Sequence, residues 1–282
     1  MVDQLFKNFE SNIRNFNIHN MLTMARLAKL AYDDQENIRR QLVTSGAELT
    51  HFWDKDDTQA FLAIYHNNII LSFRGTQPDV LADWITDLKI HKIVSPAHSI
   101  QGFVHRGFLG ALETVWDTGS GSIAHKLHEA ISLAARDGIP KIFITGHSLG
   151  AALATLATSL CCDMVKKYLS GLYTFGSPRV GDANFCGMLY RAVDNQIFRV
   201  VNNNDIVTRI PTRSMGYDHT AGLWYLHEDG HITNDPSWWQ MFLDRAVGTF
   251  YDIGSIGVDA VKDHSMENGE DGYIQALIKN IK

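Results

Sequence analysis

Residues 145–150, TGHSLG, constrain the fold of this chain more than any other stretch. They follow a short apolar run, 141–144, and precede an Ala- and Leu-rich run, 151–160. The first run is β-branched and aromatic, which predicts a buried strand, and the second predicts a buried helix. A Gly-x-Ser-x-Gly motif between a strand and a helix is typical of a nucleophile elbow, a sharp turn that presents a reactive serine.

The glycines of this motif indicate how tight the turn is. We expect Gly146 and Gly150 to lie where side chains do not fit, so that Ser148 projects outward. The first N–H groups of the following helix have no carbonyl partner inside the helix, and they point toward the group that Ser148 attacks. Together with the helix dipole, they could stabilise a developing oxyanion. The motif therefore predicts a nucleophilic serine.

Composition limits the class of protein. The chain has 282 residues, of which 45% are hydrophobic and 20% charged, enough for a large core. We see no internal repeat, low-complexity tract or linker, so we expect one domain over residues 1–282. The net charge is −6 and no Lys/Arg run stands out, which argues against a nucleic-acid partner. The three cysteines show neither a disulfide pattern nor zinc spacing, so we expect free thiols and no metal.

The chain shows no targeting or membrane signal. Its first residues lack the continuous apolar region of a signal peptide, and no stretch approaches the ~18–20 apolar residues of a membrane span. These observations predict a cytoplasmic protein, with secretion by a route or leader not visible in the sequence as the alternative. Nothing in the pattern specifies an oligomeric state.

The order of the expected elements predicts an α/β fold. A helix is expected over residues 18–32, and residues 42–53 are irregular with at most a short strand. Residues 61–65 and 69–73 are expected to form a hairpin, whose turn relies on the ability of asparagine to adopt the left-handed conformation. Further strands are expected at 171–175, 196–201 and 223–226, and residues 237–282 are mostly helical around a loop at His264. Strands joined by helical crossovers predict a mostly parallel mixed sheet with helices on both faces and reactive loops at the strands' C-terminal ends.

A short amphipathic helix is predicted at residues 79–88, capped by Asp79. Its apolar side chains share one face; they are Val80, Leu81, Trp84, Ile85 and Leu88.

A serine nucleophile needs a base and a carboxylate that orients the base. On this fold they follow the serine in the order acid, then histidine, on loops after later strands. Asp205 lies directly after the strand 196–201, and Asp182, after the preceding strand, is the second candidate.

The residues alone do not choose the base. The downstream histidines are His219, His227, His231 and His264. Of these, only His264 lies beyond the last expected strand, in a polar loop. His147, next to the nucleophile, is interpreted as structural because it points away from Ser148.

Seven stretches in register resemble the class 3, or fungal-type, triacylglycerol lipase family of the α/β-hydrolase fold. They are residues 72–76, 83–88, 104–108, 145–150, 174–181, 204–207 with Pro211, and 263–264, and they span roughly 60–265. The resemblance implies a triad of Ser148, Asp205 and His264. It also implies an oxyanion hole formed by the N–H of Leu149 with Thr76, and it makes the helix 79–88 similar to the family's mobile lid.

Two departures accompany the resemblance. The chain shows neither leader nor disulfides, so it is more similar to bacterial or intracellular members. A tyrosine closely follows the family's catalytic histidine, whereas here residues 269–272 precede Tyr273. His219 matches a family motif whose histidine is not the base.

The predicted function is that of a serine carboxylic-ester hydrolase, a triacylglycerol lipase that releases fatty acids through an acyl-enzyme without metal or organic cofactor. Its expected partner is a lipid ester, at a lipid–water interface. The alternatives are a phospholipase A1 or a feruloyl-type esterase on the same triad, and a catalytically silent binding protein that kept the fold.

Overall fold

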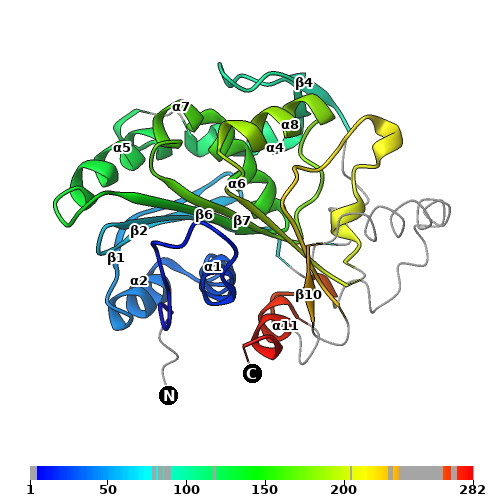
Figure 1. Ribbon diagram of the computed structural model, residues 1–282. Helices are drawn as coiled ribbons and strands as arrows, with labels where there is room; N and C mark the ends of the chain where they lie inside the picture. Colours follow the sequence, from blue (N-terminus) through cyan, green and yellow to red (C-terminus); the bar gives the residue numbers. More distant parts are fainter. Residues whose placement is uncertain are drawn as a thin grey trace.

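An eight-stranded sheet runs through the middle of the molecule in the computed structural model (Figure 1). The structure describes residues 5–77, 81, 85, 90–116, 119–203, 205–227, 231–234, 263–267 and 272–281. The strands lie in the order β1-β2-β3-β6-β7-β8-β9-β10. Their bounds are β1 Glu48–Lys55, β2 Thr58–Tyr65, β3 Asn68–Phe73, β6 Lys141–His147, β7 Leu169–Phe175, β8 Ile197–Asn202, β9 Leu223–Leu226 and β10 Ile232–Thr233. Pairing is parallel from β3 to β9 and antiparallel at both edges, which confirms the predicted mixed sheet.

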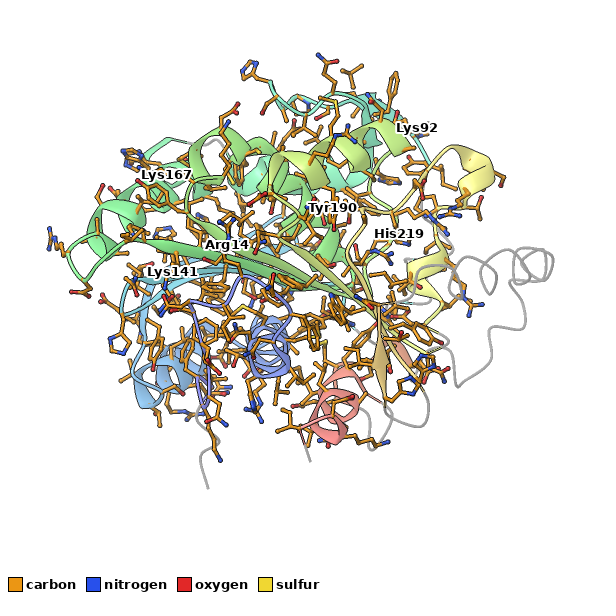
Figure 2. The ribbon with its side chains drawn as sticks, in the orientation of Figure 1. Arg14, Lys92, Lys141, Lys167, Tyr190 and His219 are labelled. Carbon is orange, nitrogen blue, oxygen red and sulfur yellow. The ribbon has the colours of Figure 1, made fainter. Side chains whose placement is uncertain are left out.

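Helices cover both faces of the sheet (Figure 1). One face carries α1 Ile18–Leu30, α2 Gln35–Thr44 and α11 Tyr273–Lys279, and the other carries α4 Arg106–Trp116, α5 Ile123–Ala134, α6 Leu149–Leu160, α7 Cys162–Val165 and α8 Ala183–Ala192. Side chains fill the space between the layers (Figure 2). Because neighbouring side chains of a strand point to opposite faces, Ile142 and Ile144 join the cluster under α4–α6 while Phe143 joins the one under α1. A strand buried on both faces must therefore be continuously apolar.

The hairpin of β2 and β3 is confirmed, but its turn differs from the prediction. Tyr65 pairs with Asn68, so the turn has two residues, and His66 rather than an asparagine takes the left-handed conformation, with φ 55°. The two asparagines of this region instead make hydrogen bonds through their side-chain amides. The Nδ2 of Asn68 donates to the Tyr65 carbonyl at 2.9 Å, and that of Asn67 donates to the Ile139 carbonyl at 2.6 Å.

The region before β2 is more regular than predicted: residues 42–53, expected to be irregular with at most a short strand, contain most of the eight-residue strand β1. Helix α2 begins after Asp34, whose carboxylate accepts from the Asn37 N–H at 2.8 Å, and it buries only Ile38 and Leu42. Such a narrow apolar face leaves little periodicity in the sequence. A second, two-stranded sheet was also not predicted; it pairs β4 Lys92–Val94 with β5 Phe103–His105. Short 3-10 turns complete the described elements at Gly119–Gly121, Val207–Arg209 and Arg213–Met215.

Two sequence predictions fall largely outside the described residues. In the predicted helix 79–88, only Leu81 and Ile85 are described; both have helical backbone, Leu81 is buried and Ile85 half-buried. In the predicted helical region 237–282, the structure describes residues 263–267 and α11; Asp263 and His264 have helical backbone, where a loop was predicted. Within the described residues, no helix is both long and apolar enough to cross a membrane. All three cysteines are free and buried, as expected.

Candidate active site

Ser148 occupies the turn between β6 and α6. Its φ is positive, 58°, with ψ −129°, a strained combination that residues other than glycine rarely adopt, and its N–H donates to the Phe175 carbonyl at 2.9 Å. A Cβ on Gly146 would lie 2.3 Å from the Gly150 carbonyl oxygen, and a Cβ on Gly150 would lie 2.3 Å from that of Phe73. Both glycines are therefore required by close backbone approach, as the motif predicts.

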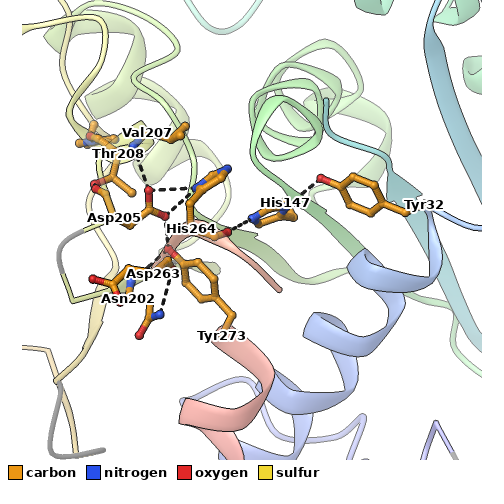
Figure 3. Close-up of polar contacts among 10 residues, drawn as sticks. Tyr32, His147, Asn202, Asp205, Val207, Thr208, Asp263, His264 and Tyr273 are labelled. Atoms are coloured by element: carbon orange, nitrogen blue, oxygen red, sulfur yellow. Dashed lines mark hydrogen bonds and ion pairs between the residues drawn. The ribbon is translucent and has the colours of Figure 1, made fainter. Parts of the chain in front are cut away.

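Asp205 lies beyond the end of β8 and is fully buried. Its Oδ1 accepts from the Val207 N–H at 2.9 Å, and both of its carboxylate oxygens lie 2.9 Å from Nδ1 of His264 (Figure 3). Since a carboxylate only accepts, Nδ1 of His264 carries the proton and a neutral ring keeps a lone pair on Nε2. This is the tautomer that a general base needs.

His264 lies close to the residues that surround the elbow. A Cβ on Gly176, the residue after Phe175, would lie 2.8 Å from Nδ1 of His264. Ser148 and His264 are 0% and 2% exposed. Within the described residues, the Oγ of Ser148 and the Nε2 of His264 are buried without a hydrogen-bond partner. The site thus holds a free hydroxyl and a free imidazole lone pair in the same buried region.

The end of β3 packs against the elbow from the other side. A Cβ on Gly75 would lie 2.9 Å from Cβ of Ser148 and 2.5 Å from the His147 carbonyl oxygen. Thr76 follows directly and is half-buried, and Leu149 opens α6. Two segments far apart in the chain are therefore brought beside Ser148, and each carries one of the two residues that the sequence predicts as oxyanion donors.

The other sequence candidates have different contacts. Asp182 caps α8 by accepting from the Phe185 N–H at 2.8 Å, which accounts for its position. His219 lies 2.6 Å from the Thr208 carbonyl oxygen through Nε2, and burial, with Arg199 and Arg179 nearby, holds its pKa well below the usual value. The rings of His227 and His231 stack on each other, with centroids 4.2 Å apart.

Tyr273 is a site residue whose role the sequence did not predict. Its hydroxyl donates to Oδ2 of Asp205 at 2.6 Å and accepts from the Asn202 N–H at 3.0 Å (Figure 3). Burial and the neighbouring Asp205 raise its pKa well above the usual value, so it stays a donor. The one sequence signal for it is the tyrosine that follows the histidine in the resembling family.

Metal ligands are not gathered at this site: within the described residues, no group of three or more His, Cys, Asp or Glu side chains is placed to hold an ion. Ser148, His264 and Asp205 bring an alcohol, an imidazole and a carboxylate to this site.

Comparison with known proteins gives one family. A family model for lipase (class 3) matches residues 70–215. A secreted mono- and diacylglycerol lipase of Fusarium solani is 32% identical over 68% of this chain and 54% of its own length. A triacylglycerol lipase of Ricinus communis is 28% identical over 65% of this chain and 44% of its own length. The chain thus spans about half the length of these curated relatives.

A solved structure agrees in architecture. The lipase from Rhizopus microsporus var. chinensis superposes with a TM-score of 0.61 at 26% identity, covering 74% of each chain. The parallel sheet, the elbow and this similarity identify an α/β-hydrolase fold. The family match spans the elbow and Asp205 and covers more than half of the chain. The chain belongs to the class 3 lipase family.

Proposed function

We propose that this protein is a serine carboxylic-ester hydrolase with Ser148 as nucleophile, His264 as base and Asp205 as the orienting acid. The observation that carries the proposal is the buried hydrogen bond from Nδ1 of His264 to Asp205. It supports a histidine that keeps its Nε2 lone pair for the serine proton.

The chemistry proceeds in two halves. Ser148 attacks the acyl carbonyl while Nε2 of His264 takes its proton, and the N–H of Leu149 with Thr76 stabilises the oxyanion. His264 then gives the proton to the leaving alcohol, which departs and leaves an acyl-enzyme. Water, deprotonated by the same Nε2, attacks the acyl carbonyl; His264 then returns the proton to the Oγ of Ser148 as the acid leaves. Asp205 stabilises the imidazolium formed in each half.

The substrates are acylglycerols, with triacylglycerol first. The relatives named as triacylglycerol and as mono- and diacylglycerol lipases support this class. Hydrolysis of tributyrin and longer triacylglycerols, compared with phosphatidylcholine and methyl ferulate, tests it. Turnover confined to the phospholipid or the ferulate would replace it with one of the alternative specificities.

Access to the nucleophile requires a movement. Ser148 is 0% exposed, so an ester cannot reach it in this state. The segment 79–88 is the lid in our proposal, and buried Leu81 supports a closed arrangement. Opening at a lipid surface would present the apolar face of this segment, which includes Leu81 and Ile85, to lipid.

The decisive experiment replaces the nucleophile. Ser148→Ala is expected to lower kcat by about 10⁴- to 10⁶-fold and to abolish labelling by a fluorophosphonate, with the melting temperature retained. Ser132→Ala is the matched control, because Ser132 lies exposed on α5 and, among the described residues, its hydroxyl bonds to the His128 carbonyl of its own helix. A Ser148→Ala variant with a tenth of wild-type activity would refute the proposal.

Secretion is the proposed location. The relatives from Fusarium solani and Penicillium cyclopium are named as secreted lipases, and the comparisons lend no support to the cytoplasmic prediction. Immunodetection in culture medium and in washed cells of the source tests this location.

A further inference from the structure

We propose that Tyr32 and His147 are a pair of positioning residues that fix the catalytic base relative to the nucleophile, an inference that rests on the proposed function. The Tyr32 hydroxyl lies 2.8 Å from Nδ1 of His147, and Nε2 of His147 lies 2.6 Å from the His264 carbonyl oxygen (Figure 3). His147 directly precedes Ser148 in the chain. The path therefore runs from the end of α1, through the nucleophile turn, to the backbone of the base.

The acceptors along the path determine the direction of each hydrogen bond. A carbonyl oxygen only accepts, so Nε2 of His147 carries a proton. Burial lowers the pKa of His147 well below its usual value, so the ring is neutral and Nδ1 is an acceptor. The Tyr32 hydroxyl must then donate to it. A single arrangement of protons satisfies all three groups.

Neighbouring carbonyls of the His264 segment are held by other parts of the molecule. The Asp263 carbonyl accepts from the side chain of Asn202 at 2.9 Å, and the Ser265 carbonyl accepts from the Tyr273 N–H at 3.0 Å. These bonds tie the segment to β8 and α11, which hold Asp205. The bond from His147 to the His264 carbonyl instead reaches the element that carries Ser148. It is thus suited to set the distance between base and nucleophile rather than between base and acid.

Tyr32 also contacts the segment that carries Thr76, one of the two proposed oxyanion donors. A Cβ on Gly75 would lie 2.3 Å from the Tyr32 hydroxyl oxygen, so the backbone before Thr76 packs directly on this group. One phenol therefore contacts the start of the oxyanion segment and orients the histidine beside the nucleophile. A displacement here would move the base and the oxyanion donors relative to Ser148 together.

The test measures kcat per active site, titrated with a fluorophosphonate, on a short soluble ester. Tyr32→Phe is expected to lower kcat about fivefold, the effect of one neutral hydrogen bond. His147→Leu is expected to lower it about 10²-fold, the effect of a misplaced catalytic group. In both variants KM is unchanged. His147→Gln should recover most of the loss, because its amide N–H can reach the His264 carbonyl.

Two further variants complete the test. Because Tyr32 orients the base through His147, its hydroxyl has no histidine to orient in His147→Leu, and the double variant should lose less than the product of the two single losses. Tyr173→Phe is the matched control: its hydroxyl is buried without a partner among the described residues, and its loss should leave kcat unchanged.

Two results would overturn the positioning role. One is a wild-type kcat per titrated site in Tyr32→Phe and His147→Leu, with only the melting temperature lowered. The other is losses that multiply in the double variant. An active Ser148→Ala variant would instead refute the proposed function itself, so the two failures are distinguishable.

Discussion

Asp205 shows at the scale of one residue how a buried charge is accommodated. Burial of a carboxylate is costly unless donors replace its water. The Val207 N–H, the Tyr273 hydroxyl and Nδ1 of His264 all converge on its two oxygens. These donors offset the cost of burial and fix the plane of the carboxylate, so the position of His264 follows from that of Asp205.

Tyr273→Phe tests this arrangement. We expect a loss of about 1.5–3 kcal/mol in the free energy of unfolding, because the hydroxyl bonds to a buried carboxylate. We also expect kcat to fall roughly tenfold as the acid loses its orientation. Urea denaturation and ester hydrolysis measure the two effects. Tyr217→Phe is the control, since its buried hydroxyl has no partner within the described residues. Equal effects from both substitutions would count against a specific role for Tyr273.

Local pattern predicted the positions of Ser148 and Asp205, because each directly follows a strand. His264 could be selected only by its place beyond the last strand and by family resemblance. The contact of Tyr273 with Asp205 joins residues 68 positions apart, and no periodicity or motif reports such a distance. The catalytic roles of Ser148, Asp205 and His264 remain predictions.

The elbow is the element on which the site depends, and its glycines can be tested. Gly150→Ala is expected to cost about 3 kcal/mol or more, because a Cβ would overlap the Phe73 carbonyl. Gly110→Ala, in the exposed middle of α4 with nothing within 4 Å, should stabilise by about 0.5–1 kcal/mol. Thermal and urea denaturation compare them. A stable Gly150→Ala variant would contradict the close approach of β3 and α6.

The lid segment can be tested through Leu81. Burial of a leucine side chain contributes about 1.5–3 kcal/mol. If Leu81 covers the site in the closed state and enters lipid in the open state, Leu81→Ser should spare hydrolysis of a soluble ester. It should also reduce the increase in rate above the substrate's solubility limit. A lower melting temperature with equal loss on both substrates would indicate a permanently packed residue instead.

The elements that could be predicted are those with a strong apolar pattern. The continuous apolar runs of β2, β3 and β6 are visible because both sheet faces are buried. Helix α2 buries only Ile38 and Leu42, and β4 is exposed along its length, so neither leaves a clear apolar pattern. Such elements depend on tertiary contacts that the local sequence does not encode.

The topology of the whole molecule explains why the site forms where the parallel strands end. Strands β3, β6, β7 and β8 are parallel, so the segments after them emerge at the same edge. Gly75, Ser148, Gly176 and Asp205 all follow the ends of these strands. His264 reaches this edge from the C-terminal part of the chain, with its segment bonded to β8 and α11.

The stability of the whole molecule should fall in mild acid because the fold holds His147 and His219 neutral. Burial holds the pKa values of His147 and His219 well below the usual value of about 6.5. The unfolded chain therefore binds more protons than the folded one as pH falls through 6.5, and protonation favours unfolding. Between pH 7.5 and 5.5, each histidine that stays neutral in the fold costs about 1.4 kcal/mol of unfolding free energy.

Urea denaturation at the two pH values measures this loss. His219→Gln, whose amide can still donate to the Thr208 carbonyl, should reduce it, because one of the two neutral histidines is gone. His128→Gln, at an exposed position on α5, should leave it unchanged. The direction follows from burial, since a histidine stabilised by a carboxylate would instead strengthen the fold as pH falls. A loss that His219→Gln does not reduce would show that His219 takes up a proton without unfolding the chain. It could then not be the neutral, carbonyl-bonded ring described above.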